Sequence, residues 1–238
     1  MNDALSKFAT ILDLDGQWLD RQVYYVDNYL FPSDIAGKRM LDIGGGDGFL
    51  GLYNRIVRGA SSISIIDSYD SHEGKGGHES GYDNMMEIIQ RHKIENVDVI
   101  KSDIRDVKLS SEQFDSVYAR NSFHHIFGHY RTEDSEIVEL MVSIRESLVP
   151  GGSLIIGETS RNQVWRFIPP IRNRMANGPW IHKKIAPERL KRCATSAGFK
   201  SVAVRWYTLY KLRSLKPLLS NQVANAFMTG SYIVEFQK

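Results

Sequence analysis

Short apolar runs alternate with amphipathic stretches along most of this chain. Five runs rich in aliphatic residues indicate buried strands, at residues 39–43, 61–67, 97–103, 114–120 and 153–158. In the stretches between them, apolar residues recur every three or four positions, a spacing that buries one face of a helix. This spacing predicts helices over residues 16–31, 49–56, 83–93 and 137–148. Strands that alternate with helices predict an α/β fold with a parallel sheet and right-handed crossovers.

The alternation is interrupted once, by an irregular stretch at residues 158–186 that contains three prolines and two tryptophans. Just before it, the VPGG sequence at 149–152 predicts a tight turn ahead of the fifth strand. The pattern resumes with a helix that begins at a proline and stops at a glycine, over residues 187–197. Apolar runs at 201–209 and 230–238 then predict a sixth and a seventh strand.

No linker or internal repeat divides the chain into two cores. We therefore predict a single domain over residues 1–238, in which residues 1–36 form an N-terminal helical cap and 158–186 an inserted lid. The hydrophobic content of 42% and the charged content of 24% are typical of a soluble globular protein. Cys193 is the single cysteine, which excludes an internal disulfide and fits a reducing compartment. No signal-peptide pattern or membrane-spanning run is present, so we expect a cytoplasmic protein.

The net charge of +2 hides an uneven distribution. Residues 150–238 hold 15 Lys and Arg against 3 Asp and Glu, whereas residues 1–149 hold the other 15 against 25. A basic half of this kind can attract an anionic partner. It can equally be a solvated surface that is rich in Lys and Arg, and the charge count alone leaves both interpretations open.

Glycine is concentrated in the sequence RMLDIGGGDGFLG, where five glycines fall within eight positions after the first predicted strand. A glycine loop between a strand and a helix lets backbone N–H groups approach an anionic ligand at the positive end of the helix. Gly46, Gly48 and Gly51 match the dinucleotide pattern G-x-G-x-x-G, but two further glycines come between that pattern and the strand. Counted from Asp42, the same loop has the pattern acid-x-Gly-x-Gly-x-Gly.

The second pattern, in this context, resembles the class I S-adenosylmethionine-dependent methyltransferases of small molecules. Asp67 ends the second strand and Asp103 follows the third, where that family has acidic residues. The sequences FDSVYARNSFHHI and LVPGG resemble the family's fourth strand, the loop after it and the turn before the fifth strand. The resemblance covers residues 42–158 well and the rest loosely. It implies a Rossmann-like, seven-stranded, mostly parallel sheet with helices on both faces and an antiparallel last strand.

The resemblance also implies S-adenosylmethionine as cofactor, with S-adenosylhomocysteine as product, and a role for each motif. The glycine loop would face the methionine moiety, Asp67 would accept from the ribose hydroxyls, and Asp103 would accept from the adenine amino group. The implied cofactor-binding residues are Asp42, Gly44, Gly46, Gly48, Asp67, Ser68, Ser102, Asp103, Ile104, Arg120 and Asn121. Taken singly, each acidic residue here can also be an ordinary strand-end or loop cap.

Two adjacent histidines follow the fourth strand and are the candidates for a general base. A neutral imidazole at pH 7 can accept a proton from a hydroxyl or an acidic carbon while the methyl group moves. His125 and His124 are therefore the candidate catalytic residues, with His129 and Tyr130 as weaker ones. The alternative for the pair is that one histidine packs in the core while the other only lines the pocket.

A polar, glycine-rich loop at residues 70–82 contains two histidines and two glutamates. Their spacing fits no standard pattern of metal ligands, so we predict a loop over the ribose and no metal.

The methyl acceptor should meet the lid and the N-terminal helix, where aromatic and cationic side chains occur together. The candidate substrate residues are Trp165, Arg166, Arg172 and Trp180. This mixture suits a small-molecule acceptor that is anionic, a sugar, quinone-like or lipid-linked. The basic and apolar residues 207–219 predict either a helix packed on the sheet or an interfacial helix in peripheral contact with a membrane. A nucleic acid substrate is not favoured, because the chain has no RNA-binding module and no Asn-Pro-Pro-Tyr segment.

Two other functions stay open on the sequence. A nicotinamide (NAD) oxidoreductase would use Gly46, Gly48 and Gly51, and would bind NADH but not S-adenosylhomocysteine. A cofactor-binding module without catalysis would bind the methyltransferase cofactor and need neither histidine. The acceptor, the methylated atom and the oligomeric state are not determined by the sequence.

Overall fold

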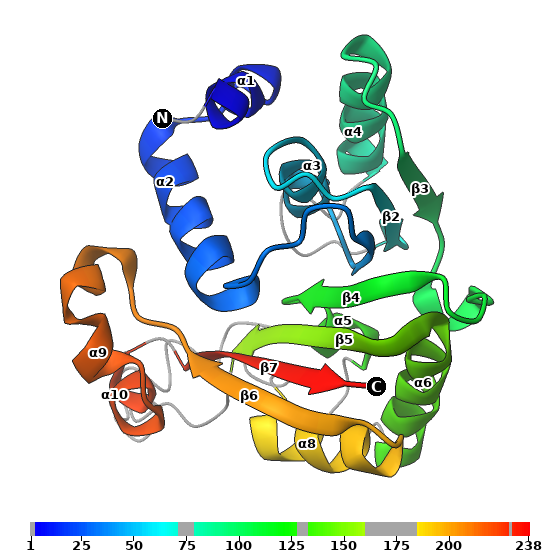
Figure 1. Cartoon of the computed structure of the whole chain (residues 1–238), viewed down its shortest axis with the longest axis vertical. Coiled ribbons are helices and arrows are strands. Elements are labelled where there is room, and N and C mark those ends of the chain that lie inside the picture. Colours follow the sequence, from blue (N-terminus) through cyan, green and yellow to red (C-terminus); the bar gives the residue numbers. More distant parts are fainter. Residues whose placement is uncertain (1–2, 71–78, 128–132, 160–184, 229) are drawn as a thin grey trace.

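In the computed structural model, which describes residues 3–70, 79–127, 133–159, 185–228 and 230–238, seven strands form one sheet (Figure 1). The strands are β1 (Arg39–Ile43), β2 (Ser62–Asp67), β3 (Val97–Lys101), β4 (Phe114–Arg120), β5 (Leu148–Thr159), β6 (Lys200–Trp206) and β7 (Ser231–Gln237). They lie in the order β3-β2-β1-β4-β5-β7-β6. The strand order therefore reverses between β1 and β4, because β2 and β3 lie on one side of β1 and the later strands lie on the other. Open α/β sheets bind ligands at this point of reversal.

The strands pair in parallel from β3 to β5, and β7 pairs antiparallel with both β5 and β6. The predicted mostly parallel, seven-stranded sheet with an antiparallel last strand is thus confirmed. Because β1, β2, β3 and β4 run the same way, their carboxyl ends and the loops that follow them meet at one edge. The start of β7 lies at this same edge, since Ser231 pairs with Thr159 at the end of β5.

Helices cover both faces of the sheet. They are α1 (Asp3–Ile11), α2 (Gly16–Tyr25), the π-helical η1 (Val26–Leu30), α3 (Phe49–Ile56), α4 (Glu79–Arg91), α5 (Phe123–Ile126), α6 (Asp134–Ser147), α8 (Pro187–Ser196), α9 (Lys216–Leu219), α10 (Gln222–Phe227) and the 3-10 segments η2 (Ile104–Asp106) and η5 (Tyr210–Leu215). The two-residue period of a strand assigns side chains to the two faces. Met40 packs with α1 to α4, whereas its neighbour Leu41 packs with α6 and α8.

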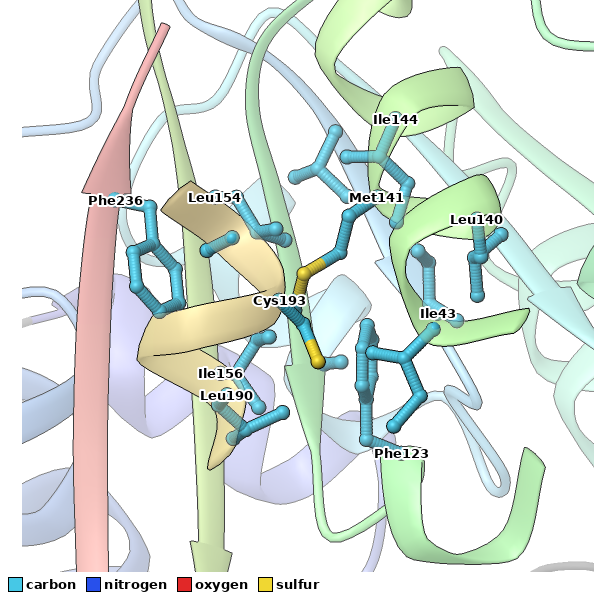
Figure 2. Packing of buried hydrophobic residues seen from close by; sticks show 14 of the residues in the cluster. Ile43, Phe123, Leu140, Met141, Ile144, Leu154, Ile156, Leu190, Cys193 and Phe236 are labelled. Atoms are coloured by element: carbon cyan, nitrogen blue, oxygen red, sulfur yellow. The ribbon is translucent and has the colours of Figure 1, made fainter. Parts of the chain in front are cut away.

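The core under α6 and α8 contains the single cysteine. Figure 2 shows Cys193 and Leu190 of α8 beside Met141 of α6, with Leu154 and Phe236 projecting from the sheet. Burial raises the pKa of the Cys193 thiol, which keeps it protonated and a poor nucleophile. This cysteine is therefore part of the hydrophobic core.

The N-terminal helices are fixed to the sheet by aromatic packing and by an arginine. The fully buried Phe8 of α1 meets the rings of Phe49 and Tyr53 in α3, each at 5.5 Å between centroids. Arg205 of β6 donates through Nε to the carbonyl of Tyr29 at 2.5 Å and pairs with Glu235 of β7 at 2.6 Å. A cation that binds the last carbonyls of a helical segment satisfies acceptors that have no partner within the helix.

Several details differ from the sequence prediction. The helix predicted over 16–31 divides into α2 and η1, and the helices α5 and α10 were not predicted. The turn predicted at 149–152 is wrong, since these residues belong to β5. There the register with β4 shifts by three residues between Phe114 and Ser116, and Gly151 has a φ of 77°. The extra β5 residues form a bulge-like interruption of the pairing between β5 and β4.

The segment predicted as an interfacial or packed helix is broken in the structure into η5 and α9. Tyr210 packs edge-on against Tyr24 at 5.5 Å, and the Lys216 ammonium lies 4.8 Å from the ring centre of Tyr29, so the segment does pack on the N-terminal helices. Leu218 of α9 is 72% exposed. Peripheral membrane contact through this segment stays a prediction.

Candidate active site

A cavity of about 600 Å³ opens at the carboxyl ends of β1, β2 and β4. Its lining residues come from the ends of these strands, from the loops and helices that follow them and from the segment after β3: Asp42, Ile43, Gly44, Gly45, Gly46, Asp47, Phe49, Leu50, Ile66, Asp67, Ser68, Asp70, Ser102, Asp103, Ile104, Arg120, Asn121, Ser122, His125 and Ile126. The structure thus brings together every candidate cofactor residue except Gly48. It also places His125 in the same cavity, whereas His124 does not line it.

The glycine loop is shaped by close contacts within the protein as well as by the cavity. Gly44 has a φ of 72°, and a Cβ there would lie 2.2 Å from Cβ of Ser122 in the loop after β4. Gly48 has a φ of 74°, and its Cβ would lie 2.1 Å from Sδ of Met85 in α4. Both positions need glycine for the backbone conformation and for the close approach. Gly48 therefore positions α3 against α4, outside the cavity.

Asp67 at the end of β2 connects the glycine loop to its own strand. Its Oδ2 accepts from the Gly46 N–H at 2.9 Å and its Oδ1 accepts from the Tyr69 N–H at 2.8 Å. Each carboxylate oxygen can accept a second hydrogen bond, so both keep acceptor capacity on the side of the cavity. This arrangement fits a ligand with two neighbouring hydroxyl groups.

Asp103 after β3 is more fully engaged than Asp67. It accepts from Arg105 Nε at 2.9 Å, from Arg105 Nη2 at 2.5 Å and from the Arg105 N–H at 2.9 Å. The hydrogen bonds from Arg105 hold the pKa of the Asp103 carboxyl below its usual range, so it is an anion at neutral pH. Ser102 and Ile104 line the cavity on either side of it.

Asp42 is buried beneath the glycine loop in a small polar cluster with Asn54 of α3 and Tyr118 of β4, each at most 1% exposed. Asp42 Oδ2 has no hydrogen-bond partner within the described part of the chain. Burial, with the nearby Asp67 charge, raises the pKa of the Asp42 carboxyl to about 8. A cationic group bound in the cavity would lower this pKa and stabilise the carboxylate.

The donor set fits S-adenosylmethionine. The N–H groups of Gly44, Gly46 and Gly48 already donate within the protein, so the glycine loop would contribute close approach of its backbone to the ligand. The unpartnered Asp42 oxygen suits an ammonium group, and Asp67 suits the ribose hydroxyls. Asp103 keeps an acceptor site for an amino group. These residues would hold the cofactor, and the individual contacts stay predictions.

One of the two histidines, His124, is hydrogen-bonded to a buried acid that was not among the residues predicted from the sequence. His124 Nδ1 lies 2.7 Å from Oε2 of Glu158, and the His124 N–H donates to Oε1 at 3.2 Å. Glu158 is 2% exposed, and the rings of His124 and His125 are 4.1 Å apart between centroids. The sequence held a signal for Glu158, because this residue follows an apolar run as Asp67 does. The carboxylate fixes the ring orientation of His124, and His124 packs against His125.

A second cavity of about 210 Å³ adjoins the first and shares two of its lining residues. It is lined by Arg21, Gln22, Tyr25, Arg120, Asn121, Glu158, Tyr207 and Ser231. Arg120 Nη2 donates to Oε1 of Gln22 at 2.6 Å, and the guanidinium lies 4.6 Å from the ring centre of Tyr25. Tyr25 reaches this position because residue 157 is glycine: a Cβ there would lie 2.6 Å from the tyrosine hydroxyl.

Asn121, which follows Arg120, has the left-handed backbone that is uncommon outside glycine, with a φ of 53°. Its N–H donates to the carbonyl of Gly157 at 2.7 Å, which ties the loop after β4 to β5. Left-handed residues of this kind often occur at functional sites. The strained turn places Arg120 and Asn121 at the boundary between the two cavities.

Several predicted residues lie outside the described residues. They are the substrate candidates Trp165, Arg166, Arg172 and Trp180, the weaker base candidates His129 and Tyr130, and most of the loop at 70–82. Among the residues that are described, no three His, Cys, Asp or Glu side chains gather into a group able to hold a metal ion. No helix in the described ranges is long and apolar enough to cross a membrane.

Comparison with known proteins agrees with this geometry. Residues 78–156 match the model of a family described as a methyltransferase domain. An S-adenosylmethionine-dependent methyltransferase from Mesorhizobium loti superimposes with a TM-score of 0.61 at 15% identity, over 95% of this chain and 100% of that chain. Another, from Aquifex aeolicus, has a TM-score of 0.59 at 16% identity, over 98% and 97% of the two chains. No curated protein sequence gives a significant match.

At these identities the solved structures establish a shared fold, and the family model independently covers the segment from before α4 into β5. The strand order with an antiparallel β7 and the cavity over β1 and β4 agree with both findings. The cofactor implied by that family is S-adenosylmethionine. The chain therefore has the fold of these S-adenosylmethionine-dependent methyltransferases, and its residues 78–156 match a methyltransferase domain.

Proposed function

We propose that the protein transfers a methyl group from S-adenosylmethionine to a small-molecule acceptor, with His125 as the general base. One observation carries the proposal: a single cavity contains the glycine loop, Asp67, Asp103 and His125. The first three bind the cofactor in this scheme, and His125 faces the space where an acceptor must meet it.

The cofactor, when bound, supplies a methyl group that is already activated by a positively charged sulfur. The protein's residues therefore need only to bind, orient and exclude water, and no covalent enzyme intermediate is needed. Asp67 and Asp103 hold the adenosine part, and the glycine loop with Asn121 holds the amino acid part. Phe49 and Leu50 line the cavity at the start of α3 and reduce its access to water.

His125 accepts the acceptor's proton at a ring nitrogen in this scheme. His124 and Glu158 are positioning residues, because the buried carboxylate fixes His124 and the His124 ring packs on His125. Base catalysis of this kind typically contributes about 10²- to 10⁴-fold to a rate. It is needed when the nucleophile is a hydroxyl or an acidic carbon.

The acceptor in this proposal is a small molecule of the kind expected from the sequence: anionic, a sugar or lipid-linked. The support is the size of the second cavity, about 210 Å³, and its two arginines. The nicotinamide alternative gains no support from the structure. Two of its three glycines, Gly48 and Gly51, pack against Met85 and Ile65 and do not line the cavity.

The test has two parts. Calorimetric titration should show micromolar binding of S-adenosylhomocysteine, a binding free energy of about −8 kcal/mol. It should show no binding of NADH. Binding of NADH alone would overturn the methyltransferase function. Release of S-adenosylhomocysteine is then measured over a panel of acceptors, which separates an active enzyme from a module that only binds the cofactor.

For the base, His125→Ala should leave cofactor affinity unchanged and lower turnover on the order of 10²-fold. His92→Ala is the matched control, because His92 is exposed after the end of α4, away from both cavities. Turnover of His125→Ala close to that of the control would remove His125 from the mechanism.

A further inference from the structure

We infer that the second cavity is the acceptor subsite, and that Arg21 and Arg120 bind a carboxylate group of the acceptor there. The inference rests on the proposed function and deepens it, since it names the acceptor's chemical class. It is carried by the position of the cavity, by the charge of its lining and by the geometry of Arg120.

The position follows from the order of strands along the edge of the sheet. Asp103 follows β3, Asp67 ends β2 and the glycine loop follows β1, so the cofactor residues run across the sheet in the order β3, β2, β1. The second cavity continues the same line over β4, β5 and the start of β7, beneath α2. Arg120 and Asn121 belong to both cavities. A molecule in the second cavity is therefore next to the amino acid end of the cofactor residues.

The charge of the lining favours an anion. Arg21 and Arg120 are permanently cationic, and Glu158 is the one carboxylate in the described lining. Both oxygens of Glu158 already accept from His124. Burial raises the pKa of Tyr25 to about 12, so its hydroxyl stays protonated and adds no negative charge. Tyr207, Gln22 and Ser231 contribute neutral polar groups.

The side chain of Arg120 is preorganised to bind a planar anion. Its guanidinium lies against the Tyr25 ring at 4.6 Å, and its bond to Gln22 uses one of five N–H donors. A stacked guanidinium presents its remaining donors in a rigid fork, which matches the two oxygens of a carboxylate. Because the side chain is already ordered, little further conformational entropy is lost when the anion binds.

The size of the cavity limits the acceptor to a small molecule. A volume of about 210 Å³ is below the range of about 300–1,000 Å³ that is usual for drug-sized ligands. It accommodates the carboxylate end of a small organic acid, whose atom to be methylated would extend past Arg120 and Asn121 into the first cavity, which His125 lines. We commit to a carboxylate because the fork of Arg120 is planar, and treat phosphate as the competing outcome.

The experiment titrates small anions into the whole protein, with and without saturating S-adenosylhomocysteine. The probes are acetate, malonate and benzoate, each paired with its neutral amide, and inorganic phosphate. At least one carboxylate should bind about tenfold more tightly than its amide, the difference expected for one charge-assisted hydrogen bond. Arg21→Gln and Arg120→Gln should each remove this preference.

Arg213→Gln is the matched control. Arg213 is also stacked on a tyrosine, at 4.3 Å from the ring centre of Tyr210, but it lines neither cavity. It should keep the carboxylate preference. Arg21→Gln should also bind S-adenosylhomocysteine within about twofold of the unsubstituted protein, because Arg21 lies outside the cofactor cavity.

The inference is overturned by equal binding of carboxylates and amides, by tighter binding of phosphate than of every carboxylate, or by unchanged binding in both variants. Arg21 is exposed, so Arg21→Gln folds even if Arg120→Gln does not. Failure of S-adenosylhomocysteine to bind would instead overturn the proposed function. The carboxylate titration without that ligand still measures the subsite in that case.

Discussion

The two cavities are adjacent, yet they are built in different ways. The cofactor cavity takes its polar residues from consecutive strand ends, so each residue lies close in sequence to the element that positions it. The second cavity combines α2, the ends of β4 and β5, the residue after β6 and the start of β7, from Arg21 to Ser231. The positions of the lining residues therefore depend mainly on local sequence in the first cavity and on tertiary packing in the second. Substitutions on the two sides should therefore have separable effects.

The largest expected effect on the cofactor side comes from Gly44→Ala. The new Cβ would meet Ser122 at 2.2 Å on a left-handed backbone. Overpacking typically costs about 1–3 kcal/mol, and the left-handed conformation adds roughly 1–2 kcal/mol. Urea unfolding and titration with S-adenosylhomocysteine should both show the loss.

Gly37→Ala separates the two causes. Gly37 has a φ of 74° but no atom within 4 Å of the position of a new Cβ. This control should lose only the roughly 1–2 kcal/mol of backbone strain and keep cofactor affinity. Equal losses in the two variants would show that the contact with Ser122 is unimportant.

Asp42→Asn should change how stability depends on pH. The folded-state pKa of about 8 is above the ordinary value of 3.8, so the folded protein binds the extra proton between these values. The stabilisation from this group is complete below pH 3.8 and is lost as pH rises to about 8, at about 1.4 kcal/mol per pH unit. Asparagine does not titrate, so the variant does not lose stability in this way as the pH rises. The free energy of unfolding of the variant relative to the parent should rise by about 3 kcal/mol from pH 5 to pH 7.

Urea unfolding of both proteins at pH 5 and pH 7 measures this difference. Asp83→Asn, on the exposed side of α4, controls for removal of a carboxylate from the surface. Parallel pH profiles for Asp42→Asn and the parent would contradict the raised pKa.

Asp67→Ala should weaken binding of S-adenosylhomocysteine by about 1–3 kcal/mol, or roughly 5- to 150-fold, because hydrogen bonds to a charged group are lost. Asp103→Ala should weaken it less, since Arg105 already occupies both Asp103 oxygens. Calorimetry with S-adenosylhomocysteine measures which of the two variants loses more affinity. Unchanged affinity in Asp67→Ala would remove the ribose assignment, and the reverse order would mean that Arg105 leaves Asp103 when the cofactor binds.

The smallest effect is expected on the acceptor side. In Gly157→Ala the new Cβ would lie 2.6 Å from the hydroxyl of Tyr25, the far end of a side chain that can shift. Stability should fall by less than about 1 kcal/mol and cofactor affinity should stay within about twofold. Affinity for small carboxylates should change severalfold. A larger loss of cofactor affinity than of carboxylate affinity would contradict the separation of the two cavities.

The sheet, and the gathering of most candidate residues in the first cavity, could be predicted from the sequence because both depend on short stretches. Each strand is a local apolar run, and Asp67 and Asp103 are marked by their places at strand ends. Gly48 shows the limit of this reasoning, because its contact with Met85 depends on how α4 packs. No local pattern indicates that contact.

Glu158 and the arginine pair could not be found as a site from spacing alone. Glu158 is separated by 34 residues from His124 in sequence, and Arg120 by 98 from Gln22. The turn at 149–152 was mispredicted for a similar reason. Its glycines form a turn-like sequence, but pairing with β4 and β7 keeps the segment within a strand.

The contact of Arg205 with the N-terminal helices has a consequence for how the protein is made. Residues 26–30 are translated long before Arg205, which binds the Tyr29 carbonyl, and before Glu235, which pairs with Arg205. The contact of η1 with β6 therefore forms only after most of these 238 residues have been translated, whereas α1 can pack on α3 much earlier. The second cavity combines α2 with Tyr207 and Ser231, so it is completed late in synthesis although α2 is translated early.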